Sequence, residues 1–334
     1  MLKKCFAACV GLAAALTLIP PSVLGQSAGN EIPMRTPDGQ PHLSGTFTFR
    51  ALTPMQRPAQ FAEGLETLNP EEAAAFEASE RTRQNRDLFD PEKGQPSAGY
   101  QPRAEGGVLS YNEFWYERGV ELTADKRTSL IIDPPSGRYP RLTEEGRRAG
   151  QERASYRREH MYDSYENRSL GDRCMMFGKS GPPIRSGAYN NNLMIFQTAN
   201  HVVILTEQAR MARIIPLDEN PQPAFEQLGG VSRGHWEGET LVIETTQIRN
   251  WGDGRHSPSM HLVERLTRLD PDTVAYEYTV TDPSVYTAPY TVMMPFRRTD
   301  GPIFEYACHE GNVGLYGILA GARRLESQRR ELRR

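Results

Sequence analysis

The chain has 334 residues and a formal net charge of −3, and 38% of its residues are hydrophobic. This balance excludes the strongly basic composition of many nucleic-acid-binding proteins, so we expect no nucleic-acid partner. The 25 prolines and 29 glycines indicate many turns and favour one β-rich domain over two compact ones. The composition specifies no oligomeric state.

The N-terminus has the pattern of a cleavable signal peptide. Two lysines precede an apolar run over residues 6–19, and Gly25 is a small residue suited to cleavage. The run of about 14 residues is too short to span a bilayer, and we expect no membrane span elsewhere. We therefore predict a signal peptide at 1–25, a flexible leader at 26–44, and a periplasmic or secreted mature protein.

Removal of the signal peptide leaves two cysteines, Cys174 and Cys308. In an oxidising compartment an even pair most often forms a disulfide. Such a bridge would close a loop of about 135 residues and would stabilise the fold by roughly 4–5 kcal/mol in the chain-entropy model. A reactive thiol and two buried free thiols are the alternatives.

The N-terminal half is predicted to wrap around the rest of the domain. Alternating phenylalanines and threonines predict a strand at 45–50, and RTSLIID predicts another at 127–133. Asn-Pro-Glu-Glu at 69–72 supplies an N-cap, a first-turn proline and two acids, so it predicts a helix to about residue 87. A charged surface helix is predicted over 143–167.

From residue 192 the pattern changes to closely spaced strands. Residues 273–281 alternate strictly, which places two tyrosines and two valines on one face. Glu237-Gly238 and Asp270-Pro271-Asp272 are turn sequences that join neighbouring strands into hairpins. Nine strands are predicted, at 193–198, 201–207, 211–216, 231–236, 239–246, 261–269, 273–281, 290–298 and 303–308.

These strands predict a mainly β fold, an antiparallel barrel or half-barrel of the lipocalin or calycin type. Two or three peripheral helices are expected in the N-terminal half. The single β-rich domain is predicted at 45–322, with an extended and helical wrap at 45–190 and the barrel at 191–322. The barrel includes a short helix near its end, and 323–334 form a charged tail. A barrel of this size can hold one small ligand.

The candidate catalytic residues lie at the end of segment 301–314. Histidine titrates near neutral pH, so His309 is predicted to act as a base, with Glu310 as its orienting group or partner acid. If 303–308 is a strand, Cys308 and His309 point to opposite faces and serve different sites. Alternatively, His309 bonds a loop carbonyl and Glu310 faces water.

Three further segments contain candidate substrate-binding residues. Asn190 and Asn191 carry amides that donate and accept hydrogen bonds, although asparagines also suit a turn. Tyr111 and Trp115 belong to an aromatic stretch that either lines a pocket or fills the core. Arg127 is suited to binding a carboxylate, or makes a turn or cap contact.

We expect neither a bound metal nor a cofactor. His256 and His261 are five residues apart with a proline between them, and no HExxH motif is present. The sequence also lacks a Gly-rich phosphate loop, a GxSxG elbow and a dinucleotide-binding fingerprint.

Eight segments in order resemble a large family of exported proteins from environmental Gram-negative bacteria. The resemblance covers about residues 43–323 and implies export, and no catalytic residue is transferred from it. The first segment also resembles the Gly-x-Trp opening of lipocalin-type barrels, with Phe47 at the tryptophan position. The segments are LSGTFTFRALTPMQRP, YNEFWYERG, RTSLIIDPPSGRYPRLT, SYENRSLGDRC, GAYNNNLMIFQT, HVVILTEQARMARIIPLD, SRGHWEGETLVIETT and EYACHEGNVGLYGILAGAR.

These observations predict an exported enzyme that performs metal-free acid–base chemistry on a small molecule, as a lyase, isomerase or hydrolase. The alternative is a non-catalytic periplasmic carrier for a small apolar or aromatic ligand. An enzyme requires a perturbed histidine near an acid inside a cavity, whereas a carrier requires only the cavity.

Overall fold

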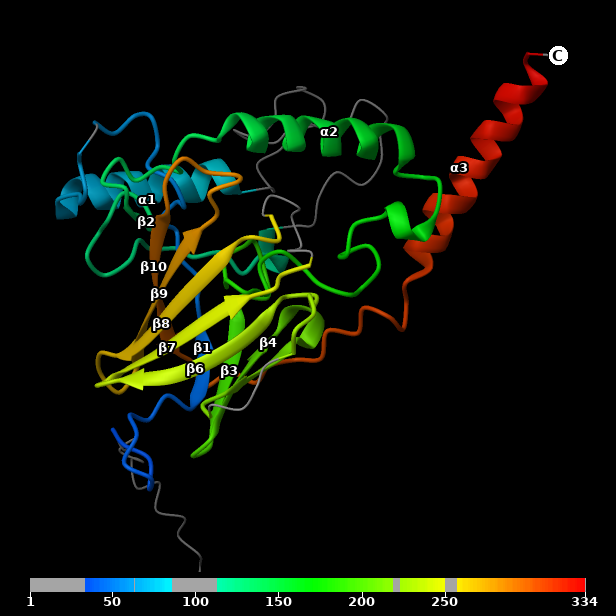
Figure 1. Ribbon diagram of the computed structural model, residues 1–334. Helices are drawn as coiled ribbons and strands as arrows, with labels where there is room; N and C mark the ends of the chain where they lie inside the picture. The colour runs from blue at the N-terminus through cyan, green and yellow to red at the C-terminus, as the bar shows by residue number, and fades with distance from the viewer. Residues whose placement is uncertain (1–33, 63, 86–112, 219–222, 250–256, 334) are drawn as a thin grey trace, which may run out of the picture. The chain divides into compact units, whose positions relative to one another are not determined.

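The computed structural model describes residues 34–62, 64–85, 113–218, 223–249 and 257–333. The predicted signal peptide and residues 26–33 of the predicted leader lie outside these ranges, as do the candidate residue Tyr111 and His256. The described part is mainly β and contains three α-helices (Figure 1). None of its helices is both long and apolar enough to cross a bilayer.

Ten strands within the described ranges form one antiparallel sheet. Its order is β5-β4-β3-β1-β10-β9-β8-β7-β6, and β2 pairs additionally with β10. The strands are Gly45–Thr48 (β1), Ile131–Asp133 (β2), Asn192–Gln197 (β3), His201–Thr206 (β4), Ala212–Pro216 (β5), Val231–Glu237 (β6), Thr240–Thr246 (β7), His261–Arg268 (β8), Thr273–Thr281 (β9) and Tyr290–Arg298 (β10).

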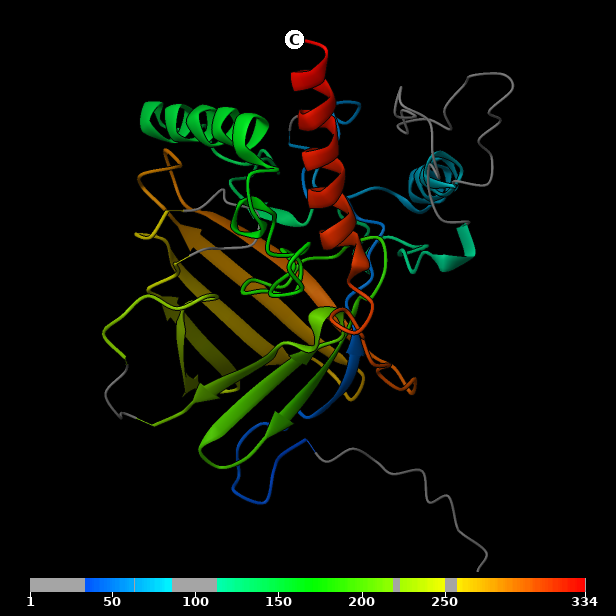
Figure 2. The ribbon, with the colours of Figure 1, turned by 90° about the vertical axis from the view of Figure 1, so that its right-hand side faces the viewer.

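The sheet curls until its two end strands, β5 and β6, lie next to each other without pairing. In Figure 2 the green strands near residue 200 lie in front of the gold and orange strands of the same sheet. The predicted antiparallel barrel is therefore confirmed as a nearly closed barrel. The strand predicted at 45–50 is present as β1, which lies between β3 and β10 and so belongs to the barrel itself.

The barrel interior is filled by large side chains. The predicted alternation in β9 is confirmed, because Val274, Tyr276, Tyr278 and Val280 are all at most 1% exposed. Tyr276 stacks on Phe296 of β10 with ring centres 4.6 Å apart. Aromatic area of this size dominates core stability, so the interior is a packed core.

Two of the helices lie in the N-terminal half, as predicted. They are α1 (Pro70–Gln84) and α2 (Glu144–His160). Asn69 and Glu72 cap α1 reciprocally, and the Thr143 side chain caps α2. Both end earlier than predicted, α2 by seven residues, because a turn and a short 3-10 helix, η3 (Tyr165–Asn167), follow it.

The C-terminal segment differs most from the sequence prediction. No strand forms at 303–308, and Phe304 in this segment is exposed. The prediction that Cys308 and His309 point to opposite faces of a strand is therefore wrong. Alternating apolar residues fit an extended segment outside a sheet as well as a strand. The predicted short helix and charged tail form one helix, α3 (Val313–Glu331), because arginine and glutamate favour helices.

Two other boundaries shift. Glu237 pairs with Thr240, so the β6–β7 turn residues are Gly238 and Glu239 rather than Glu237 and Gly238. Gly238 has a φ of +60°, the left-handed conformation that glycine accepts readily. The strand predicted at 127–133 is limited to β2.

Candidate functional site

A cleft of about 860 Å³ lies at one rim of the barrel. Arg50 follows β1, Asn192 begins β3 and Glu207 follows β4, and the antiparallel pairing of these strands brings all three ends to the same rim. The 3-10 helix η2 (Glu113–Trp115) and the segment 299–306 after β10 complete the cleft. We call this site the aromatic cleft.

Exposed aromatic rings form the walls of the aromatic cleft. Phe114, Trp115 and Phe304 are 73%, 62% and 70% exposed, although large aromatic side chains are costly to leave in water. Phe114 and Trp115 contact each other with ring centres 4.6 Å apart. Trp115 therefore lies in a pocket wall, and the alternative of a core-filling role is wrong for it.

The floor of the cleft is polar and charged. The Asn192 side-chain amide donates to Glu117 Oε1 at 3.1 Å and to Glu207 Oε2 at 2.9 Å, so one amide links two carboxylates. Arg50 lies 3.8 Å from Glu117. Glu207 is only 5% exposed, so its carboxylate lies in a partly dehydrated environment, whereas Arg50 and Glu117 are partly exposed.

Lys179 interacts electrostatically with the two floor glutamates but does not line the cleft. Its Nζ is 4.8 Å from the centre of the Tyr189 ring, and Tyr189 lines the cleft. Burial lowers the pKa of Lys179 from 10.5 to about 8, although Glu207 and Glu117 act in the opposite direction. A buried amine with a lowered pKa beside a cleft is a typical feature of functional sites.

The two predicted asparagines have different positions. Asn191 is fully buried: its Oδ1 accepts from Gly187 N, and its Nδ2 donates to the carbonyl oxygens of Gly187 and Glu117. Asn190 lines the cleft and has a φ of +52°. Asn191 therefore fixes the loop, and Asn190 is the one available to a ligand.

The other predicted site residues lie outside the cleft. His309 and Glu310 are both exposed in a turn, and neither lines the clefts described here. Arg127 is bound to Asp125, with Nε 2.7 Å from Oδ2, which agrees with a turn contact. The geometry thus brings Trp115 and Asn190 together and leaves the proposed catalytic pair apart from them.

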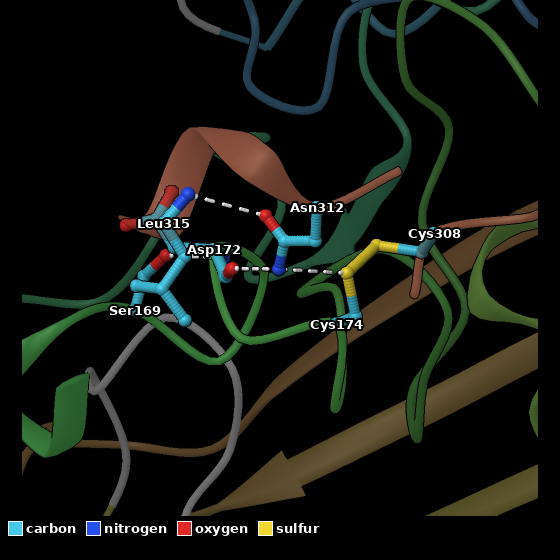
Figure 3. The surroundings of a disulfide bond; sticks show 6 residues. All are labelled: Ser169, Asp172, Cys174, Cys308, Asn312 and Leu315. Atoms are coloured by element: carbon cyan, nitrogen blue, oxygen red, sulfur yellow. Dashed lines mark hydrogen bonds between the residues drawn. A yellow bond between two sulfur atoms is a disulfide. The ribbon is translucent and has the colours of Figure 1, made fainter. Parts of the chain in front are cut away.

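The predicted disulfide between Cys174 and Cys308 is confirmed, with Cα atoms 5.6 Å apart. Figure 3 shows that Asn312 reinforces the link. Its side-chain amide donates to the Asp172 carbonyl at 2.9 Å, and its Oδ1 accepts from Leu315 N at the start of α3. The polar residues after Cys308 thus include a helix cap, and the disulfide ties down the segment that carries Phe304.

A second, smaller hollow of about 330 Å³ lies at the seam between β5 and β6. Arg213 reaches from its wall into the core, where Nη1 donates to the fully buried Glu264 at 3.0 Å. Arg213 also donates to Ser232 and Thr245, and the Tyr276 hydroxyl donates to Glu264 at 2.6 Å. This saturated network holds the seam together.

Sequence reasoning did not identify the floor of the aromatic cleft. The floor glutamates Glu117 and Glu207 and the neighbouring Lys179 come from three separate segments, and no local motif links them. The loop GAYNNN, which supplies Tyr189 and Asn190, and the aromatic stretch that supplies Trp115 gave the usable signals. Within the described ranges, no cluster of three or more His, Cys, Asp or Glu side chains could hold a metal ion.

No family model matches the chain, and no curated protein does. Among solved structures, a point mutant of the fluorescent protein UnaG is 19% identical, with 33% of this chain and 72% of that chain covered and a TM-score of 0.22. A similarity this low supports no argument about function. The aromatic cleft must therefore be interpreted from its own residues.

Proposed function

We propose that the protein binds a small, planar apolar or aromatic molecule in the aromatic cleft. The observation that carries the proposal is the convergence of three exposed aromatic side chains, Phe114, Trp115 and Phe304, over one polar floor. Ligand sites typically combine apolar walls with a few well-placed polar groups. A bound ring would remove these side chains from water and would meet Asn190 at the edge of the cleft.

Binding is favoured over the acid–base enzyme predicted from the sequence. His309 and Glu310, the predicted catalytic pair, are exposed and lie outside the cleft. Catalysis stays a second candidate function because of a different group: Glu117, Glu207 and Lys179 form a titratable cluster at the floor. In that case these residues, rather than His309 and Glu310, would catalyse the lyase, isomerase or hydrolase reaction.

We propose further that the protein works in the periplasm or after secretion. The disulfide between Cys174 and Cys308 supports an oxidising compartment, because cytosolic reductants keep most thiols reduced. The proposed ligand is accordingly one that such a compartment contains or receives. Membership of the exported family suggested by the eight sequence segments remains part of this proposal.

The binding proposal is tested with N-phenyl-1-naphthylamine, an uncharged aromatic dye that fluoresces in apolar sites. Trp115→Ala and Phe304→Ala should each weaken its affinity by about tenfold, since each removes one wall of the cleft. Phe225→Ala is the matched control, because Phe225 is 65% exposed and lies outside the cleft. Equal affinity in all three variants would contradict the proposal.

A further inference from the structure

Lys179 is held by a loop shaped around it. A side chain at Gly187 would place its Cβ 2.7 Å from Lys179 Cδ and 3.2 Å from Nζ, so the glycine leaves room for the lysine. Asn191 fixes Gly187 through hydrogen bonds to both its N–H and its carbonyl. The same loop presents Tyr189 to the aromatic cleft, so one aromatic ring contacts the amine and lines the ligand space, while Lys179 itself does not line the cleft.

The amine itself is incompletely satisfied. Lys179 Nζ has essentially no exposed surface and no hydrogen-bond partner within the described residues. Nearby charge comes from Glu207 and Glu117, and the Tyr189 ring lies against the ammonium. A buried amine without hydrogen bonds is unfavourable for stability, which makes a structural role a poor explanation of its position.

This environment favours the neutral, nucleophilic form of the amine. With a pKa of about 8, about half of the Lys179 side chains are neutral at pH 8. The two floor glutamates, Glu207 and Glu117, add negative charge near the amine. A desolvated lysine beside a cleft is one of the standard ways in which proteins activate an amine for attack on a carbonyl.

We propose that Lys179 forms an imine with an aromatic aldehyde or ketone bound in the aromatic cleft, an inference that rests on the proposed binding function. The Nζ lone pair attacks the carbonyl carbon, and the carbonyl π electrons move to oxygen. A proton moves from nitrogen to oxygen to give a carbinolamine. Loss of the hydroxyl and of the second nitrogen proton releases one water and leaves the C=N bond.

The test uses benzaldehyde and sodium cyanoborohydride at pH 8, with peptide mapping by mass spectrometry. The hydride reduces the imine to a stable benzylamine and marks the lysine that formed it. Lys126 is the internal control, because it is a partly exposed lysine that donates to Glu77. We expect Lys179 to be labelled at least about tenfold faster than Lys126. Equal rates would overturn the inference.

Variants separate the chemistry from general damage to the fold. Lys179→Arg keeps the positive charge and should abolish this label, whereas Lys126→Arg should leave labelling of Lys179 unchanged. Trp115→Ala should slow labelling by benzaldehyde several-fold but not labelling by propanal, which needs no aromatic wall. Unchanged benzaldehyde labelling in Trp115→Ala would overturn the link between the amine and the cleft.

The two proposals fail in different ways. If the wild type binds N-phenyl-1-naphthylamine but Lys179 is labelled no faster than Lys126, the imine is overturned and the binding function stands. If Lys179 is labelled selectively but the dye does not bind, the binding function falls and the reactivity of the lysine has another cause.

Discussion

The barrel interior and the aromatic cleft differ in whether their buried polar groups have hydrogen-bond partners. Inside the barrel, Glu264 accepts from Arg213 and Tyr276, and Arg213 also donates to Ser232 and Thr245. Burial and the neighbouring Glu264 raise the pKa of Tyr276 well above its ordinary value, so its hydroxyl stays a donor. Every member of this network has a partner.

Beside the cleft one charged group is left unsatisfied. Lys179 lacks a hydrogen-bond partner within the described residues, and aromatic rings such as Phe304 are exposed to water. A saturated network stabilises and specifies a fold, whereas unsatisfied groups beside a hollow are available to a ligand. The difference assigns a structural role to the interior and a binding role to the rim.

The largest expected effect distinguishes two buried glutamates. Glu264→Gln removes the charge opposite Arg213 and should lower the free energy of unfolding by about 3–5 kcal/mol, since a buried cation loses its partner. Glu207→Gln keeps an acceptor for Asn192 and should cost less than about 1 kcal/mol. Urea unfolding measures both. Similar losses would remove the distinction between interior and cleft.

The disulfide tests whether the cleft wall depends on a covalent link. The double variant Cys174→Ser, Cys308→Ser opens a loop with a sequence separation of 134 and should lose roughly 2–5 kcal/mol of stability. Dye binding should also weaken, because the segment bearing Phe304 is no longer tied down. Stable protein with unchanged binding would show that the wall is positioned by other contacts.

Two adjacent asparagines provide a sharper contrast within one loop. Asn191→Ala leaves buried backbone groups of Gly187 unpaired and should destabilise the protein by about 1–3 kcal/mol. Asn190→Gly suits the left-handed backbone at that position and should change stability by less than about 0.5 kcal/mol. Thermal and urea unfolding of the pair provide the check. A larger loss in Asn190→Gly would reverse the assigned roles.

The smallest effect concerns the pH dependence of stability. Folding lowers the pKa of Lys179 from 10.5 to about 8, so the unfolded chain binds more protons between these pH values. The wild type should therefore gain stability relative to Lys179→Met as the pH rises from 8 to 10.5, by on the order of 1–2 kcal/mol. A difference that stays constant over this range would show that the amine is not buried in solution.

The sequence predicted those features that depend on local patterns. The alternation around Tyr276 and Tyr278 identified a barrel strand, and the two cysteines outside the predicted signal peptide identified the disulfide. The strand prediction for 303–308 was wrong because the same alternation occurs there in a chain that pairs with no other strand.

The candidate site depended on long-range contacts and was only partly predicted. Trp115 and Asn190 were identified as candidate ligand contacts, and both line the cleft. Lys179 and Glu207 were not, because their proximity depends on the end of β4 and on the fold of the loop at Gly187. A local motif cannot encode such a convergence.

The most direct test of the account is a crystal structure of the protein with N-phenyl-1-naphthylamine. We expect the naphthyl ring to lie against Trp115 and Phe304, above the floor formed by Asn192 and its two glutamates. A dye molecule in the seam between β5 and β6, beside Arg213, would contradict it and would move the binding site into the barrel wall.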